Sequence, residues 1–270
     1  MKIAFIGGGN MASALIGGLI KRGVAPADLY VVDLGEEARA RVAKDFGVAT
    51  GAVVDSKLAD YDAILLAVKP QVLKDVAGVL QPILSKQLVI SIAAGIRAAD
   101  LSRWLGGYTQ IVRTMPNTPA LIGMGVTGLA ALPGVDDVAK ALASKVLEAV
   151  GEIVWFDDEA KIDAVTAISG SGPAYVFYFI EAMQEAARQL GMDEEQGRAL
   201  AVATFTGAAQ LAAQSGEPAS VLRERVTSKG GTTAAALAFF DAQGVKDAIV
   251  RGALAADARA KQMGEELGKA

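Results

Sequence analysis

The 270-residue sequence contains no cysteine and no histidine. The lack of cysteine excludes disulfides, thiolate nucleophiles and thiol metal sites. The lack of histidine removes the commonest general acid or base and the commonest metal ligand. We therefore expect no metal site. We also expect any chemistry to depend on a cofactor that carries its own reactive atom, while the protein supplies position and electrostatics.

Strong charge and long apolar runs are missing as well. The formal net charge is -4 at pH 7, which argues against nucleic acid or a membrane surface as the main partner. No apolar run approaches the roughly 18 uninterrupted residues of a membrane-spanning helix. Met1 and Lys2 lead directly into a strand pattern rather than into a signal peptide. We expect a soluble, cytoplasmic protein with no nucleic-acid or membrane partner.

Hydrophobic residues make up 52% of the chain, enough for a large core and two domains. Apolar strands without alternation are predicted at residues 2–6, 29–33, 63–68 and 88–93, with helices between them at 12–21, 36–46 and 71–84. This order is typical of a parallel sheet covered on both faces. Further strand-like segments lie at 110–114, 126–132 and 153–156. Only helical periodicity follows residue 160. The predicted fold class is α/β, with a doubly wound Rossmann-type sheet in residues 1–157 and an all-helical domain in residues 158–270.

A glycine-rich turn joins the first strand to the first helix. Gly7 permits the tight turn, Gly9 lets a pyrophosphate approach the backbone, and Ala12 allows close helix packing. The phosphate would lie at the positive N-terminus of the helix. A merely structural glycine turn is the alternative, but the strand-turn-helix context favours a dinucleotide site.

Asp33 closes the second predicted strand. Its carboxylate is expected to bind the adenosine ribose diol, which favours NAD over NADP. The alternative is that Asp33 caps the helix that begins at Glu36. Arg39 and Arg41 are near enough to offset the acid, so both NADH and NADPH stay open as cofactors.

Three further segments follow strands of the predicted sheet, at the edge where open α/β sheets bind ligands. In the segment after residue 68, Lys69 either contacts the cofactor or is only a solvated turn residue. In the loop 115–119, the Asn117 side chain either points toward the cofactor or only stabilises its proline-bracketed turn. The small residues that follow the strand at 88–93 offer a floor for a nicotinamide ring. The predicted cofactor-binding residues are Gly7, Gly8, Gly9, Asn10, Met11, Asp33, Val68, Lys69, Pro70, Ala93, Ala94, Gly95 and Asn117.

The helical half contains an unusual apolar helix. A small-residue turn at 169–172 leads through Pro173, which suits a first helical turn, into residues 174–180, which are apolar on every side. Such a helix must be buried all round. We therefore predict a partner subunit that covers this helix and the small-residue stretch 199–213.

A second chemical motif occupies residues 226–233, between two helical stretches. Paired glycines at 230 and 231, with hydroxyls at Ser228, Thr232 and Thr233, form a carboxylate-sized cradle of backbone amides at a helix N-terminus. An ordinary serine or threonine N-cap is the alternative. A site of hydroxyls and amides suits a small zwitterion.

Over its whole length, the chain resembles the pyrroline-5-carboxylate reductase family. The motifs that carry the resemblance are residues 6–11, 67–70, 93–95, 115–119, 168–175 and 226–233. The resemblance implies NAD(P)H-dependent reduction of the cyclic imine 1-pyrroline-5-carboxylate to L-proline. It also implies an interleaved helical dimer, sometimes assembled into a decamer, with the substrate site completed across the dimer. One departure is Asp33-Leu34-Gly35, where the family often has Asn-Arg-Ser or Asn-Arg-Thr.

The same resemblance implies roles for the cradle. Thr233 would be the catalytic residue, with its hydroxyl bonded to the ring nitrogen of the substrate. The substrate-binding set is Ser228, Gly230, Gly231, Thr232 and Thr233. Two alternatives are a dehydrogenase of the β-hydroxyacid group and a non-catalytic dinucleotide sensor. The former needs a lysine on the helix after its glycine-rich turn, and residues 175–180 contain none.

Overall fold

The computed structural model describes residues 1–269. By internal contacts, the chain forms two compact units, which are described separately. Unit 1 comprises Met1–Ser171 together with the chain from Ala256 onward, and unit 2 comprises Gly172–Ala255. The expected division after residue 157 thus differs from the compact units. Residues 158–171 and the last helical turns pack with the sheet.

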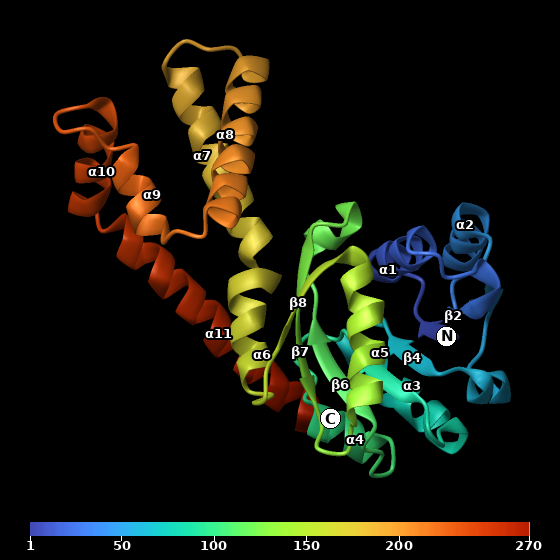
Figure 1. Ribbon diagram of the computed structural model, residues 1–270. Coiled ribbons are helices and arrows are strands. Elements are labelled where there is room, and N and C mark those ends of the chain that lie inside the picture. The colour runs from blue at the N-terminus through green and yellow to red at the C-terminus, as the bar shows by residue number, and fades with distance from the viewer. Residues whose placement is uncertain (270) are drawn as a thin grey trace. The chain divides into compact units, whose positions relative to one another are not determined.

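Unit 1 is built on an eight-stranded sheet of order β3-β2-β1-β4-β5-β6-β7-β8 (Figure 1). The strands are β1 Ile3–Ile6, β2 Leu29–Val32, β3 Ala49–Gly51, β4 Ala63–Leu66, β5 Leu88–Ser91, β6 Ile111–Met115, β7 Gly125–Ala131 and β8 Gly151–Trp155. Every neighbouring pair is parallel except β6 and β7. The nine residues 116–124 between these two strands are too few for a parallel crossover. The doubly wound sheet followed by helices confirms the predicted fold class.

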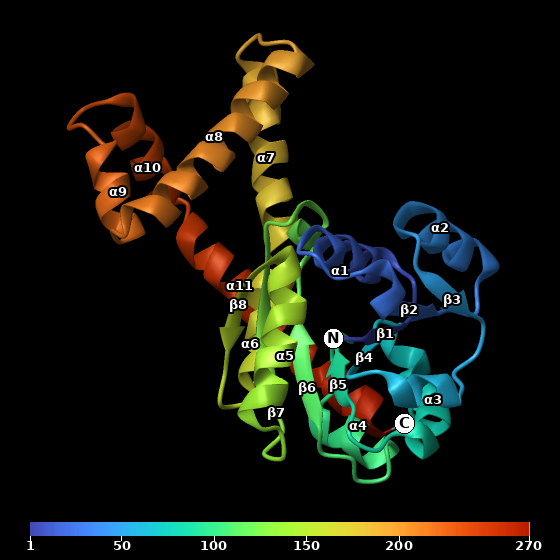
Figure 2. The same ribbon diagram turned by 45° about the vertical axis from the view of Figure 1, so that its right-hand side comes forward.

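Two apolar clusters cover the faces of this sheet. One lies beneath α1 (Asn10–Lys21), α2 (Glu36–Phe46) and α5 (Asp137–Leu147), and the other beneath α3 (Leu73–Leu80) and α4 (Ala98–Trp104) (Figure 2). All residues of β1, β2, β4 and β5 are buried, which explains their continuous apolar sequences.

The predicted helix at 71–84 is shorter in the structure. Short 3-10 turns, Pro70–Val72 and Gln81–Ile83, flank α3. Its buried face consists of Leu73, Ala77 and Leu80, whereas Val72 and Val79 remain exposed. The side chains of Val72 and Val79 are therefore not part of the apolar core.

The predicted break at 169–172 is also different. A π-helical turn, Thr166–Gly170, follows α6 (Lys161–Val165), and α7 (Gly172–Gln189) begins two residues later. The Ser171 amide donates to the Thr166 carbonyl, five residues earlier, at 2.8 Å, which is the hydrogen-bond spacing of a π-helix. The small residues thus widen a helix by one residue instead of forming a flexible loop.

The long C-terminal helix α11 (Val245–Lys269) returns to unit 1 from Ala256 onward. Figure 1 shows its red end beside α4. Leu267 packs against the cluster beneath α3 and α4, and the Arg103 guanidinium donates to the Gly268 carbonyl at 2.6 Å.

Unit 2 consists of helices and connecting loops in its described residues. Its elements are α7, α8 (Glu194–Ser215), α9 (Ala219–Arg225), α10 (Thr232–Ala242) and the first part of α11. A capping box at Asp193 and Gln196 starts α8, and left-handed Gly216 ends it. Side chains of the apolar helix remain exposed, with Phe177 59% and Tyr178 70% accessible. No helix in residues 1–269 is long and apolar enough to span a membrane.

Candidate active site

The glycine-rich turn has the backbone geometry that phosphate binding needs. Gly7 has φ +103°, and a Cβ there would lie 2.6 Å from the Ala67 carbonyl oxygen. Gly9 is the N-cap of α1, without a side-chain cap, and a Cβ on it would meet nothing within 4 Å. Exposed Asn10 and half-buried Met11 start the helix. The first amides of α1 therefore fit the pyrophosphate of a dinucleotide.

Asp33 follows β2 and accepts two backbone hydrogen bonds. Its Oδ2 accepts from Gly8 N at 2.7 Å, and its Oδ1 accepts from Gly35 N at 2.8 Å. Gly35 is the N-cap of α2, so the capping alternative has a structural basis. Each carboxylate oxygen keeps a second lone pair for a ribose hydroxyl. The geometry accommodates both roles.

Two arginines reach the same end of β2. Arg39 Nη1 donates to the carbonyls of Asp33 and Leu34 at 2.7 and 2.8 Å. Arg41 Nη2 donates to the Gly8 carbonyl at 2.8 Å. One carboxylate and two guanidinium groups therefore surround the position where dinucleotides carry their adenosine ribose.

A cavity of about 480 Å³ opens beside this charged group. It extends from Gly7 and Asp33 to an apolar wall, which residues 53–54 and residues between 68 and 79 form. Those wall residues are Val53, Val54, Val68, Val72, Val76 and Val79. Such a wall fits a flat base such as adenine. The sequence analysis placed Val72, Val76 and Val79 in a helix and gave them no part in the site. Their separation from Leu73 and Ala77 on the helix was the available signal.

The other predicted cofactor residues lie on the carboxyl side of β4 and β5. Val68 lines the cavity, whereas the Lys69 side chain is exposed and Pro70 begins a 3-10 turn. Ala93 is buried and Ala94 half-buried. Gly95, at φ +76°, would place a Cβ 3.3 Å from Met263 Cβ, so this loop is backed by α11.

Asn117 is nearly buried, with 8% of its surface exposed. Its Oδ1 accepts from Val126 N at 2.9 Å, and its Nδ2 donates to the Ser169 carbonyl at 3.2 Å. Both ends of the amide thus bind protein groups. A contact between this side chain and the cofactor remains a prediction.

The predicted substrate cradle lies in unit 2, between α9 and α10. Gly230 has φ +74°, and Gly231 is the N-cap of α10 with no side-chain hydrogen bond to the helix. A Cβ on Gly231 would lie 2.5 Å from Ser228 Oγ. The serine and threonine side chains therefore do not cap this helix, and its first amides remain available. Thr232 is exposed and Thr233 half-buried.

Arg225 stands at the end of α9, close in sequence to the cradle. It forms a two-pronged ion pair with Glu217, one contact measuring 2.6 Å. This guanidinium is therefore already neutralised by a carboxylate of the chain. The cradle itself offers amides and hydroxyls for an anion, as the sequence indicates.

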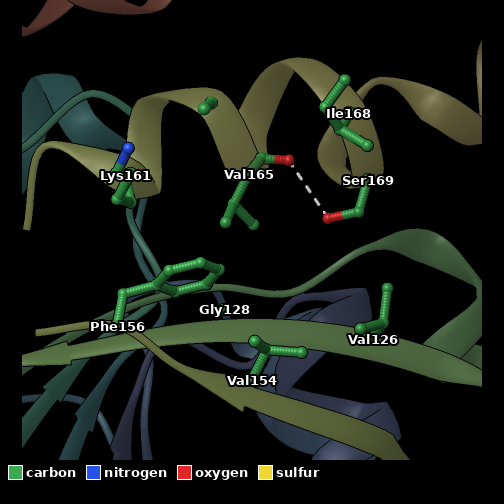
Figure 3. A pocket seen from close by; sticks show the side chains of 9 residues that line it. Val126, Gly128, Val154, Phe156, Lys161, Val165, Ile168 and Ser169 are labelled. Atoms are coloured by element: carbon green, nitrogen blue, oxygen red, sulfur yellow. Dashed lines mark hydrogen bonds between the residues drawn. The ribbon is translucent and has the colours of Figure 1, made fainter. Parts of the chain in front are cut away.

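A second hollow, of about 320 Å³, lies between the α6 segment and strands β7 and β8 (Figure 3). Its walls are largely apolar, including Val126, Val154, Phe156, Val165 and Ile168. None of the predicted site residues lines it. Within residues 1–269, no group of three or more carboxylates has metal-binding geometry.

A parallel sheet with a glycine-rich first turn, an acid after β2 and a base-sized cavity defines an oxidoreductase of the dinucleotide-binding class. Residues 2–95 match the family described as NADP oxidoreductase coenzyme F420-dependent. Residues 159–263 match pyrroline-5-carboxylate reductase dimerisation. The second match begins close to the domain boundary that the sequence predicts.

Full-length relatives narrow the class. Pyrroline-5-carboxylate reductases of Pseudomonas aeruginosa and Haemophilus influenzae are each 45% identical, covering 99% and 97% of this chain and 98% and 97% of their own. The solved reductase of Coxiella burnetii is 39% identical with TM-score 0.91, covering 97% of this chain and 98% of its own. That of Plasmodium falciparum, with NADP bound, is 30% identical with TM-score 0.86, and 98% of each chain is covered. The chain belongs to the pyrroline-5-carboxylate reductase family.

Proposed function

We propose that this protein reduces 1-pyrroline-5-carboxylate to L-proline with a nicotinamide dinucleotide as cofactor. The observation that carries the proposal is the 45% identity to pyrroline-5-carboxylate reductases over almost the whole chain. The open amides at Gly9 and the cavity beside Asp33 support the cofactor. When bound, the reduced nicotinamide supplies the hydride.

The chain's own residues bind and orient the reactants. The first amides of α1 would hold the pyrophosphate, and the valine-lined cavity would hold the adenine. Ala93 and Ala94, the predicted floor, would support the nicotinamide ring. Holding both reactants in contact supplies most of the acceleration.

Both NADH and NADPH are expected to serve. The Asp33 carboxylate favours the free ribose diol of NADH. For Arg39, the hydrogen bonds within residues 1–269 all leave from Nη1, so Nε and Nη2 remain as donors for the 2′-phosphate of NADPH. This chain has Asp33-Leu34 where the family often has Asn-Arg, and the guanidinium would come from Arg39, six residues after Asp33.

Cradle residues Ser228, Gly230, Gly231 and Thr232 would hold the substrate carboxylate, and the Thr233 hydroxyl would orient the ring nitrogen. A protonated ring imine is already electrophilic. Solvent can supply the imine proton, so the chain needs no histidine. Self-association through the dimerisation region would complete the site. The basic unit would be a dimer and the larger assembly a decamer. The protein would act in the cytoplasm.

The test is a spectrophotometric assay with pyrroline-5-carboxylate, run in parallel with NADH and NADPH. We expect consumption of both coenzymes and formation of proline. A parallel reaction with a β-hydroxy acid and the oxidised coenzymes tests the dehydrogenase alternative. Coenzyme binding without turnover of any substrate would favour the sensor alternative and contradict the proposal.

A further inference from the structure

The turn that ends unit 1 is held by a side chain from a distant loop. In a regular helix, the Ser169 carbonyl would accept from the backbone N–H of residue 173. Residue 173 is proline and has no N–H, and its ring would crowd that carbonyl. The π turn directly before Gly172 changes the helix at this point. Asn117 Nδ2 supplies a donor to the same carbonyl at 3.2 Å.

Neighbouring contacts fix the same turn. Gly170 faces Met115, and a Cβ on Gly170 would lie 2.6 Å from the methionine methyl group. Met115 is the last residue of β6 and Asn117 lies in the loop that follows, so the end of this strand and its loop contact consecutive residues of the π turn. The Ser169 hydroxyl bonds back to the Val165 carbonyl at 3.1 Å, as Figure 3 shows, and is therefore used within the helix.

The helical segment is also anchored at its start. Buried Arg113, from the middle of β6, donates to Asp163 at 2.6 Å and to Glu159 at 3.1 Å. Strand β6 thus holds the start of the helical segment through Arg113, and the loop after β6 holds its end, the π turn, through Asn117. The chain leaves unit 1 one residue after this turn.

We propose that Asn117 is a positioning residue, matched to Pro173, that fixes the chain where it passes from the coenzyme-binding unit to the unit carrying the substrate cradle. The inference rests on the proposed function, because the proposed function assigns the coenzyme to unit 1 and the substrate to unit 2. It assigns the Asn117 amide to the Ser169 carbonyl rather than to the coenzyme. Loss of this bond loosens the exit of the chain and lowers the fraction of complexes in which substrate and coenzyme meet correctly.

The test is a double-mutant cycle on the full-length protein with Asn117→Ala, Pro173→Ala and the double variant. Pro173→Ala restores the backbone N–H that a regular helix would pair with the Ser169 carbonyl. We expect Asn117→Ala to lower kcat/KM for the imine by about tenfold while changing coenzyme affinity less than about twofold. In the Pro173→Ala background, adding Asn117→Ala should lower kcat/KM much less than the same change does in the wild-type protein.

Two readouts separate positioning from general destabilisation. The primary isotope effect with coenzyme deuterated at the transferred position should rise in Asn117→Ala and return in the double variant. Hydrogen exchange of residues 166–175, measured without substrate, should follow the same pattern. Gln110→Ala is the matched control, because it removes another amide-to-carbonyl bond, to Gly134 at 2.7 Å, and Pro173→Ala should not rescue it.

Asn117→Asp is the second variant, should the alanine variant fail to fold. It keeps the acceptor for Val126 N and puts a carboxylate oxygen in place of the donor to Ser169, so it removes this bond and adds repulsion. Coenzyme affinity falling in parallel with kcat/KM would make Asn117 a coenzyme ligand and overturn the inference. Absence of rescue by Pro173→Ala would overturn it as well. Wild-type protein that fails to reduce the imine would refute the proposed function, whereas the exchange experiment would still test the pairing.

Discussion

At the scale of single residues, we expect Asp33 to set the preference between NADH and NADPH. Its carboxylate accepts hydrogen bonds from the amides of Gly8 and Gly35, and each oxygen keeps a second lone pair for a ribose hydroxyl. We expect Asp33→Ala to lower kcat/KM for NADH and to improve NADPH relative to it. A charged hydrogen bond of about 1–2 kcal/mol is at stake. Parallel kinetics with both coenzymes measure this ratio.

The matched control is Asp45→Ala, which removes an exposed acid from α2. It should leave the coenzyme ratio unchanged. If Asp33→Ala also leaves the ratio unchanged, Asp33 serves only as a cap of α2.

Thr233 tests the chemistry at the same scale. Thr233→Val keeps the branched shape and removes the hydroxyl, so fold and coenzyme affinity should persist. If the hydroxyl orients the ring, kcat/KM for the imine should fall by about 10–100-fold, the worth of one good hydrogen bond in a dry site.

Thr232→Val is the companion variant. It should lose less, because the Gly230 amide and the Ser228 hydroxyl would still hold the carboxylate, whereas Gly231 N donates to the Ser228 carbonyl at 3.0 Å. Near-wild-type turnover of Thr233→Val would show that the cradle is misassigned, and the substrate would then have to bind near Asn117 and Lys69.

At the scale of elements, the loop after β5 depends on a helix from the far end of the chain. Gly95 has a positive φ, and a Cβ on it would lie 3.3 Å from Met263 Cβ and 3.4 Å from Leu267 Cδ1 of α11. We expect Gly95→Ala to cost about 1–3 kcal/mol of unfolding free energy through backbone strain. Because the loop is the predicted nicotinamide floor, coenzyme binding should weaken too. Thermal unfolding and a coenzyme titration measure the two effects.

Gly107→Ala separates strain from position. Gly107 has φ +90°, and a Cβ on it would meet nothing within 4 Å. This variant should lose stability without losing coenzyme affinity. Equal loss of affinity in both variants would mean that the contact between α11 and the loop has no role in coenzyme binding.

The sequence predicts those elements whose cause is local. Strands such as Ile3–Ile6 are buried on both faces and read as continuous apolar runs, and the glycines at 7 and 9 mark their turn. The return of α11 to Gly95 depends on contacts between distant segments, and no periodicity encodes it. The π turn has only an indirect signal. Pro173 has no N–H to donate, and the side chain that donates to Ser169 instead, Asn117, is 52 residues before Ser169 in the sequence.

At the scale of the whole molecule, the exposed aromatic side chains of α7 predict an obligate dimer. Phe177 and Tyr178 are mostly accessible within one chain, and Phe239 of α10 is 63% exposed. All three lie in the region that matches reductase dimerisation. Covering such residues contributes roughly 1.5–3 kcal/mol for each large apolar side chain. A second copy of the chain is the proposed cover.

Dilution tests this assembly directly. If folding and association are one process, no folded monomer should persist at nanomolar concentration, and the melting temperature should rise with protein concentration. Phe177→Glu would place a charge in the covered surface and should shift the dissociation to higher concentration, whereas Val138→Glu, at an exposed position of α5, should not. Sedimentation velocity distinguishes the species. A stable folded monomer of the wild-type chain would contradict the obligate dimer, and α7 would then have to remain stable with Phe177 and Tyr178 in water.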